Sequence, residues 1–172
     1  ERKLIEMLNN AKRSLPSLYD FNLPNEGKLK FCSSVKEAVE GVHWIQESVP
    51  ERLNIKQNTY KKIQEYCSCD TIIASSTSGF KPSELNEAAI NPKQIIVCHP
   101  FNPVYLLPLV EVVPSEITDE KILSRCCQYI KNIGMNNKNF FIMKNYINLY
   151  NNLVNLTRNK NLYKDFKSQD EF

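Results

Sequence analysis

The stretch TIIASSTSG, residues 71–79, joins a short apolar run to a polar loop, and it decides the fold class. Residues 71–75 have the length and apolar content of a strand that is buried on both faces. The run QIIVC at 94–98 has the same character, and the polar loop HPFNP follows it at 99–103. Two buried strands that each end in a polar loop are typical of a parallel α/β sheet.

The segments around these strands alternate between helix and strand. Apolar spacing and capping residues predict helices at 3–18, 35–40, 50–66, 83–89 and 119–133, and strands at 29–32, 42–49, 71–75, 94–98, 109–113 and 140–143. This alternation predicts an α/β fold with an open, mostly parallel sheet and flanking helices. Because ligands of such sheets bind beyond the carboxyl ends of the strands, we expect a site at the loops 75–79 and 99–103.

The composition is that of a folded protein with one ordinary domain. The chain has 172 residues, of which 42% are hydrophobic and 24% charged, and these are globular values. A net charge of +3 without a long Lys/Arg run predicts no nucleic-acid partner. No apolar run approaches the roughly 18–20 residues of a membrane span, so we expect no membrane insertion. The six cysteines lack zinc-site spacing, so we expect no metal and buried thiols in a reducing cytoplasm.

The two ends of the chain differ in composition. Residues 1–135 have ordinary composition, and we assign them to one partial domain. Residues 136–172 contain ten Asn and no Ala, Gly, Pro, Cys or His. Such a bias marks a polar low-complexity tail or translation outside the natural frame. We therefore predict an Asn-rich tail of uncertain structure from residue 136, and we expect that the chain is a fragment.

His99 is the best candidate for a general base, because an imidazole titrates near neutral pH and this one follows a predicted strand. Glu111 lies twelve residues further on, between Val110 and Val112. A carboxylate in an apolar strand is costly unless it is paired. A contact with His99 would orient the imidazole and stabilise its protonated form. From the pattern alone, a His at a strand edge and a solvated Glu remain the alternative.

Further polar groups lie near the expected site. The hydroxyls at 75–78, which include Ser78, follow a strand, although a helix-capping loop explains them equally. Asn102 can donate to a carbonyl or hydroxyl oxygen, or it serves only as a turn residue. Glu51 and Lys56 lie at the start of a helix, where a solvated helix face is the alternative. A structural or packing role is assigned to His43, Trp44, Tyr60 and Tyr66.

Three blocks of sequence carry a resemblance to a known family. They are WIQESVPERL at 44–53, IASSTSGFKP at 73–82 and HPFNPVYLLPLVEVV at 99–113. These blocks resemble the 3-hydroxyacyl-CoA dehydrogenase family, and the third is most similar to its L-carnitine 3-dehydrogenase branch. The resemblance extends over residues 1–135. It implies a Rossmann domain followed by an all-helical dimerisation domain, and hence a homodimer for the complete protein. Residues 1–135 would then be a partial Rossmann-like, NAD-binding domain that lacks the first strands.

The resemblance also implies a reaction and roles for the site residues. The family moves a hydride between NAD and the carbon that bears the hydroxyl of a small-molecule 3-hydroxy acid. By this resemblance His99 is the general base and Glu111 is its partner. The other matches are Ser78 and Asn102, which hold the reacting oxygen and the nicotinamide, and Glu51 and Lys56, which lie on the cofactor side.

The L-carnitine branch favours oxidation of L-carnitine to 3-dehydrocarnitine. Aromatic faces can hold a trimethylammonium group. Phe101 and Tyr105 are therefore candidate substrate-binding residues, with simple packing as the alternative. A 3-hydroxyacyl-CoA and L-gulonate are the alternative substrates.

The chain departs from the family in its cofactor cradle. No GxGxxG occurs among its four glycines, and the family's first strand has no match. Pyrophosphate normally rests on that glycine-rich turn and the helix N-terminus behind it, so we expect this chain to bind NAD weakly. A non-catalytic remnant, or a scaffold that pairs through exposed sheet edges, is the alternative of another class.

Overall fold

The computed structural model describes residues 2–18, 27–102, 104, 107, 109–134 and 141–142. Contacts divide the chain into two units, Glu1–Phe141 and Ile142–Phe172. Apart from 141–142, the predicted Asn-rich tail lies outside the described residues. The site and its supporting elements all belong to the first unit.

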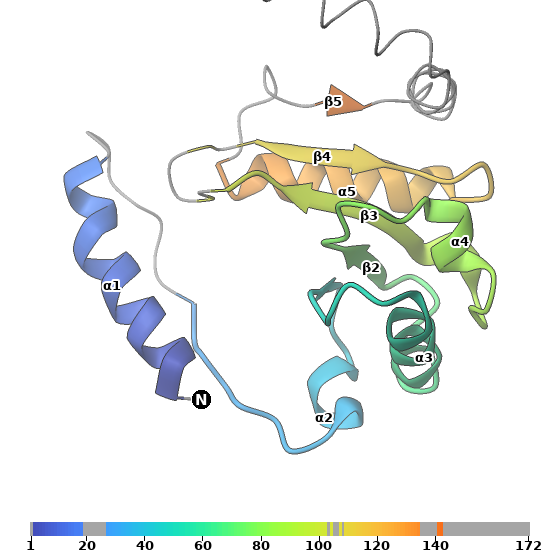
Figure 1. Cartoon of the computed structure of the whole chain (residues 1–172), viewed down its shortest axis with the longest axis horizontal. Coiled ribbons are helices and arrows are strands. Elements are labelled where there is room, and N and C mark those ends of the chain that lie inside the picture. The colour runs from blue at the N-terminus through green and yellow to red at the C-terminus, as the bar shows by residue number, and fades with distance from the viewer. Residues whose placement is uncertain are drawn as a thin grey trace, which may run out of the picture. The chain divides into compact units, whose positions relative to one another are not determined.

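The described residues form a sheet whose strand order follows the chain, β1-β2-β3-β4-β5 (Figure 1), and β1 to β4 belong to the first unit. The strands are β1 (Trp44–Glu47), β2 (Ile72–Ser75), β3 (Ile95–Pro100), β4 (Val110–Val113) and β5 (Phe141–Ile142). The pairs β1–β2 and β2–β3 are parallel, whereas β4 is antiparallel to β3. The prediction of a mostly parallel α/β sheet is therefore confirmed. This order leaves the outer edge of β1 without a partner strand among the described residues.

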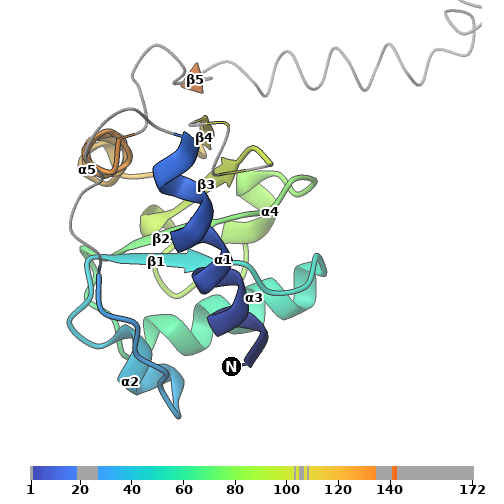
Figure 2. The ribbon, with the colours of Figure 1, turned by 90° about the vertical axis from the view of Figure 1, so that its left-hand side faces the viewer.

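The described helices are α1 (Arg2–Leu18), α2 (Val35–Val39), α3 (Leu53–Gln64), α4 (Pro82–Asn86) and α5 (Glu120–Asn132), with a 3-10 turn at Pro92–Gln94. Of these, α3, α4 and α5 cover the two faces of the sheet (Figure 1). Figures 1 and 2 show α5 on one face and α3 with α4 on the other. Successive strand residues point to opposite faces, so Ile96 and Cys98 pack with Cys126 of α5 in one core cluster. The alternate residues of β3, which are Ile95, Val97 and His99, point toward the opposite face.

The predicted helix starts have the capping contacts that the sequence indicates. The Ser34 hydroxyl accepts a hydrogen bond from the Glu37 N–H at the start of α2. The Asp119 carboxylate accepts from the Lys121 N–H at the start of α5. Gly134 follows α5 with a φ of 87°, a conformation in which glycine is favoured because it has no Cβ. These contacts satisfy backbone groups that a helix end leaves without an intrahelical partner.

One predicted strand is wrong and several predicted boundaries differ, since the strand expected at 42–49 is Trp44–Glu47 and the helix expected at 83–89 is Pro82–Asn86. Residues 29–32 form no strand, because no strand of the sheet is adjacent to them and Leu29 and Phe31 remain exposed. The helix expected from Pro50 begins at Leu53. The strand expected to stop before His99 continues through Pro100, since both residues pair with β4.

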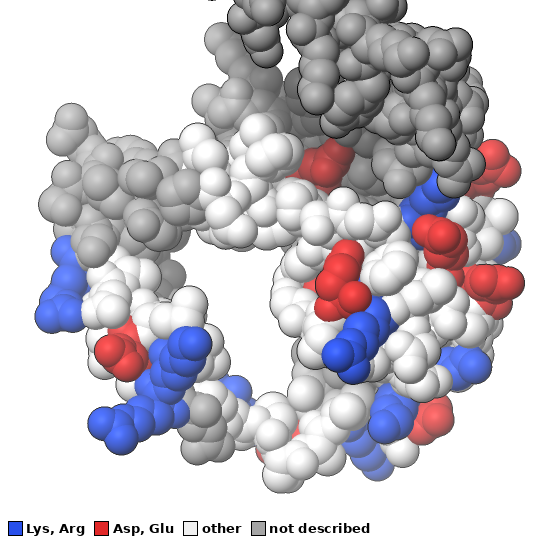
Figure 3. All heavy atoms as spheres, in the orientation of Figure 1, with Lys and Arg blue, Asp and Glu red and all other residues white. Residues whose placement is uncertain are grey.

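The described surface has no strongly basic face in the view of Figure 3, where Lys/Arg and Asp/Glu side chains are interspersed. None of the helices in the described part of the chain is long and apolar enough to cross a membrane.

Candidate active site

The central pair of the site is His99 and Glu111, which the sheet brings together. His99 lies in β3 and Glu111 in β4, and the antiparallel register sets them opposite each other. His99 Nδ1 and Glu111 Oε2 are 3.7 Å apart, and the side chains are 26% and 22% exposed. This separation is within ion-pair range but longer than a hydrogen bond of about 2.7–3.2 Å. The pair is reachable from solvent, and the carboxylate lies where it can stabilise a protonated imidazole.

An aromatic ring lies beside this imidazole. The ring centroids of His99 and Phe101 are 5.7 Å apart, and their planes are inclined at 58°. Phe101 is 38% exposed, and its N–H donates to the Leu109 carbonyl at 3.1 Å. A ligand that reaches His99 from solvent can therefore contact the Phe101 ring. Tyr105, which is also predicted to bind the substrate, lies outside the described residues.

The Glu51 carboxylate holds the loop that follows β2. Its Oε1 accepts hydrogen bonds from the Thr77 hydroxyl and from the Gly79 N–H at 3.2 Å. The Thr77 hydroxyl oxygen in turn accepts from the Phe80 N–H at 3.1 Å. Ser78 lies between these anchored residues and has an exposed side chain. The loop thus presents the Ser78 hydroxyl to solvent from a fixed backbone.

Behind this loop, a buried cluster is centred on the Glu47 carboxylate at the end of β1. The four donors to it are the Val49 N–H (2.7 Å), Lys56 Nζ (2.9 Å), the Tyr60 hydroxyl (2.6 Å) and the Ser75 hydroxyl (2.7 Å). Lys56 Nζ also lies 3.1 Å from Glu51 Oε2. The side chains of Lys56 and Glu47 are both 1% exposed. The buried ammonium of Lys56 therefore pairs with two carboxylates. Through Glu51 it connects β1 and α3 to the loop after β2.

The cluster changes the titration of two of its members. Partial burial alone would raise the pKa of Glu51, but the Thr77 and Lys56 hydrogen bonds and the Lys56 charge lower it below its usual value. The pKa of Tyr60 is raised far above its usual value, first by burial and then by the Glu47 carboxylate to which the hydroxyl donates. At neutral pH, Glu51 is an anion at the surface and Tyr60 is a neutral donor.

A second network connects the carboxyl ends of three strands. Gln46 Nε2 in β1 donates to the Ser76 hydroxyl at 2.8 Å and to the Cys98 carbonyl at 3.1 Å. The Ser76 and Ser48 hydroxyl oxygens are 2.9 Å apart. Cys98 immediately precedes His99, so this network restrains the backbone from which the imidazole projects.

Five of the eight predicted site residues form two contacting groups, which are His99 with Glu111 and Phe101, and Glu51 with Lys56. Ser78 and Asn102 follow β2 and β3 with exposed side chains. Within the described part of the chain, no hydrogen bond joins either of them to His99. Their predicted roles in holding a ligand stay predictions.

The alternative of a solvated helix face is wrong for Lys56, because its ammonium is buried in the Glu47 cluster. Sequence reasoning also missed Glu47 and assigned Tyr60 to packing, although the Tyr60 hydroxyl belongs to this cluster. A signal for Glu47 was present in the sequence. It is a carboxylate within a strand, the same feature that singled out Glu111.

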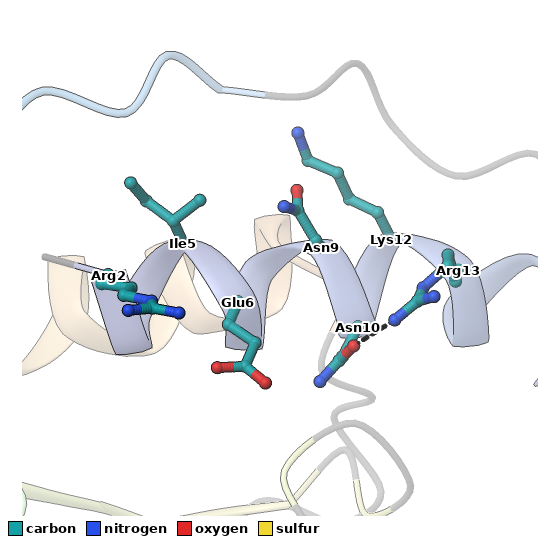
Figure 4. Close-up of a pocket in the computed structure, with 7 residues that line it drawn as sticks. All are labelled: Arg2, Ile5, Glu6, Asn9, Asn10, Lys12 and Arg13. Atoms are coloured by element: carbon teal, nitrogen blue, oxygen red, sulfur yellow. Dashed lines mark hydrogen bonds between the residues drawn. The ribbon is translucent and has the colours of Figure 1, made fainter.

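A pocket on the first unit is lined by residues of α1 alone (Figure 4). Its seven lining residues are Arg2, Ile5, Glu6, Asn9, Asn10, Lys12 and Arg13. Figure 4 also shows the Arg13 guanidinium donating to the Asn10 side chain. Since all seven residues come from one helix, this pocket is a recess along the surface of α1 and includes none of the predicted site residues.

Comparison with protein families assigns most of the chain. Residues 24–138 match the family model described as 3-hydroxyacyl-CoA dehydrogenase, NAD binding domain. The chain is 54% identical over 134 residues to the L-carnitine dehydrogenase/betainyl-CoA thioesterase of Ruegeria pomeroyi, a match that covers 78% of the chain and 28% of the relative. It is 41% identical over 135 residues to the L-carnitine dehydrogenase of Oceanobacillus iheyensis, covering 78% of the chain and 44% of that protein.

A solved structure agrees with the sheet and its helices. The structure of 5-formyl-3-hydroxy-2-methylpyridine 4-carboxylic acid 5-dehydrogenase, an NAD+-dependent dismutase, superimposes with a TM-score of 0.73 at 28% identity. That match covers 91% of the chain and 53% of the solved chain. Of the two L-carnitine dehydrogenases that it matches, the chain covers 28% and 44%, so it spans less than half the length of each.

Proposed function

Because the chain belongs to the 3-hydroxyacyl-CoA dehydrogenase family and matches its NAD-binding domain, we propose that the whole protein is an NAD-dependent dehydrogenase of a 3-hydroxy acid. L-carnitine is the favoured substrate, and 3-dehydrocarnitine is its product. The similarity to L-carnitine dehydrogenases from two organisms supports this choice over a 3-hydroxyacyl-CoA or L-gulonate.

The observation that carries the proposal is the His99–Glu111 pair at the carboxyl end of β3. His99 Nδ1 faces the Glu111 carboxylate at 3.7 Å, which leaves Nε2 to take the hydroxyl proton of a substrate. Glu111 then stabilises the imidazolium that forms. Loss of that proton favours departure of the hydride from the same carbon. Ser78 and Asn102 would hold the reacting oxygen in position.

The residues of this chain fit the nicotinamide end of NAD. The carboxamide of nicotinamide has an N–H donor and a carbonyl acceptor, and the chain offers the anionic, exposed carboxylate of Glu51 together with the exposed Ser78 and Asn102. Lys56 holds Glu51 from behind. The bound cofactor would supply the hydride acceptor, while the protein orients it. The four glycines include no GxGxxG for the pyrophosphate.

Phe101 is the described residue that best suits a quaternary ammonium. Its ring is 38% exposed and lies beside His99, and aromatic faces attract such cations. A trimethylammonium group on the substrate would therefore contact Phe101 while the hydroxyl faces His99. Tyr105 is proposed for the same pocket on the resemblance alone.

For the whole protein we also propose a cytoplasmic homodimer. Free thiols support a reducing compartment, since all six cysteines are unbridged and Cys32 and Cys69 are exposed. The homodimer rests on the family resemblance, and light scattering of the whole protein tests it.

The experiment follows NADH formation by the whole protein with L-carnitine, a 3-hydroxyacyl-CoA and L-gulonate in turn. We expect L-carnitine to have the highest kcat/KM. His99→Gln should lower kcat by about 10²–10⁴-fold, the typical contribution of a general base. The matched control is His43→Gln, at an exposed position, which should leave kcat unchanged. If the His99→Gln variant oxidised its substrate at the wild-type rate, the role of His99 would be refuted. If the wild-type protein oxidised none of the three substrates, the proposed function would be refuted.

A further inference from the structure

Two of the six cysteines form a close pair in the core. All six are free thiols, but the expectation that they are buried is wrong for Cys32 and Cys69, which are exposed. Only Cys98 and Cys126 are fully buried, at 1% and 0% exposure. Their Sγ atoms are 3.2 Å apart and share a hydrogen bond. Cys98 lies in β3 and Cys126 in α5, so the contact joins the sheet to the helix that covers one of its faces.

The geometry of this pair is close to that of a cross-link. A disulfide has an S–S length of about 2.0 Å, so the two sulfurs need to approach by roughly 1 Å. Apolar side chains surround them, including Ile96, Val112 and Ile130. A disulfide contains no polar hydrogen and suits such surroundings better than two thiols do, because thiol hydrogens need acceptors.

We propose that Cys98 and Cys126 are an oxidisable dithiol, which a hydroperoxide closes into a disulfide between β3 and α5. In the first step one sulfur attacks the peroxide oxygen, giving a sulfenic acid and releasing water or an alcohol. In the second step the other thiol attacks the sulfenic sulfur, the S–S bond forms and water leaves. The two thiols lose two electrons and two protons in total, and the peroxide O–O bond is reduced.

The closure is slow compared with oxidation of exposed cysteines. The hydrogen bond with Cys126, together with burial, holds the pKa of Cys98 well above its usual value. The reactive thiolate is therefore scarce. Cys32 and Cys69 are exposed, so their oxidation calibrates the dose of peroxide. The buried pair should instead give a disulfide, because each of its sulfurs has the other within reach.

The cross-link would restrain the strand that carries the proposed base. Cys98 immediately precedes His99, and its carbonyl accepts a hydrogen bond from Gln46. The bond would close a loop of sequence from β3 through β4 to α5. Cross-links of this kind reduce the conformational freedom of the unfolded chain. The oxidised protein should therefore melt several degrees higher, and a dithiol reductant should reverse the change.

The test uses the 172-residue chain treated with hydrogen peroxide for about ten times as long as full oxidation of Cys32 requires, because the buried thiols react more slowly. Alkylation, trypsin and mass spectrometry follow. Trypsin releases Cys98 in peptide 94–121 and Cys126 in peptide 126–131, which also contains Cys127. We expect these two peptides to be linked, with a mass lower than their sum by about 2 Da because two hydrogens are lost.

The variant Cys127→Ser identifies the partner. The linked pair should persist in Cys127→Ser and disappear in Cys126→Ser, and dithiothreitol should release it. Two results would overturn the proposal. One is recovery of Cys98 and Cys126 as alkylated thiols after this prolonged treatment of the wild type. The other is loss of the link in Cys127→Ser. Neither result depends on dehydrogenase activity, so the outcome is independent of the proposed function.

Discussion

The ammonium group of Lys56 is buried between two carboxylates, and its stability in that place depends on both of them. It lies 2.9 Å from Glu47 Oε1 and 3.1 Å from Glu51 Oε2. A third acceptor, the Val49 carbonyl, is at 3.4 Å. Three acceptors match the three donors of an ammonium group. The charge is thereby compensated in a position that would otherwise be unfavourable.

Lys56→Met should destabilise the fold strongly. The substitution leaves the Glu47 carboxylate buried without its cation, and breaking one side of a buried pair typically costs about 3–5 kcal/mol. Urea denaturation gives the free energy of unfolding. Glu47→Gln combined with Lys56→Met should recover part of the loss, because both charges are then absent.

The matched control for this substitution is Lys62→Met, at an exposed position of the same helix. Exposed positions typically change the free energy of unfolding by under about 0.5 kcal/mol. If Lys56→Met were as stable as Lys62→Met, the buried pair would contribute nothing and the cluster would have another organisation.

The burial of Lys56 could not be predicted from the sequence. Its residue type and its place early in a helix fit a solvated face, and only the position of Glu47 at the end of β1 reveals the pairing. The His99–Glu111 contact was easier to anticipate. A carboxylate inside an apolar strand demands a partner, and His99 stands at the end of the preceding strand.

At the scale of elements, α2 depends on a compact group of polar contacts at its N-terminus. The Ser34 hydroxyl accepts from the Glu37 N–H at 3.2 Å. Glu37 Oε2 accepts from the Ser33 N–H at 3.0 Å and from the Ser33 hydroxyl at 3.1 Å. Lys30 Nζ lies 3.0 Å from Glu37 Oε1. This reciprocal capping supports a helix of only five residues.

These contacts make the titration of Glu37 a test of the helix start. The Ser33 N–H and the Lys30 ammonium lower the pKa of Glu37 from 4.5 to about 2. Because the pKa is lower in the folded state, the contribution of Glu37 to stability is present above pH 4.5 and is lost as the pH falls through about 2. NMR titration of the Glu37 side chain should give a midpoint near the lower value.

Lys30→Met should raise that midpoint, because it removes one hydrogen bond and one positive charge from Glu37. Lys28→Met, which alters a neighbouring exposed lysine, should leave it unchanged. A midpoint at the ordinary value of 4.5 in the wild type would mean that the capping contacts do not form in solution.

Most elements were predictable because their patterns are local. Apolar spacing identified α1 and α5, and short apolar runs identified β2 and β3. The errors occur where pairing with a strand that is distant in the sequence determines the secondary structure. The segment at 29–32 has no neighbouring strand among the described residues, so it forms no strand and stays exposed. His99 belongs to β3 because β4 pairs with it, and a partner strand leaves no mark in the sequence of its neighbour.

At the scale of the whole molecule, the chain combines a sheet that carries the proposed base with an incomplete cofactor cradle. The four glycines include no GxGxxG, and that turn normally holds the pyrophosphate of NAD. We therefore expect the 172-residue chain to bind NADH weakly. The dissociation constant should be above about 1 mM, which corresponds to less than about 4 kcal/mol of binding free energy.

Fluorescence titration of NADH measures this binding directly. The signal with the folded chain should rise no more than with the chain unfolded in urea, which serves as the background. Saturation at micromolar NADH would contradict the expectation. It would show that residues around Glu51 and Ser78 hold the cofactor without help from a glycine-rich turn.

The register between β3 and β4 has a consequence for how such a site can change. His99 and Glu111 meet because two strands pair, so their distance is independent of the length of chain that joins them. A shift of one residue in the pairing would turn Glu111 to the opposite face. Residues can therefore be inserted or deleted between Phe101 and Leu109 while the base and its partner stay in place. Phe101, at the start of this segment, lies beside His99, so the segment is one in which a new substrate preference can be engineered without rebuilding the chemistry.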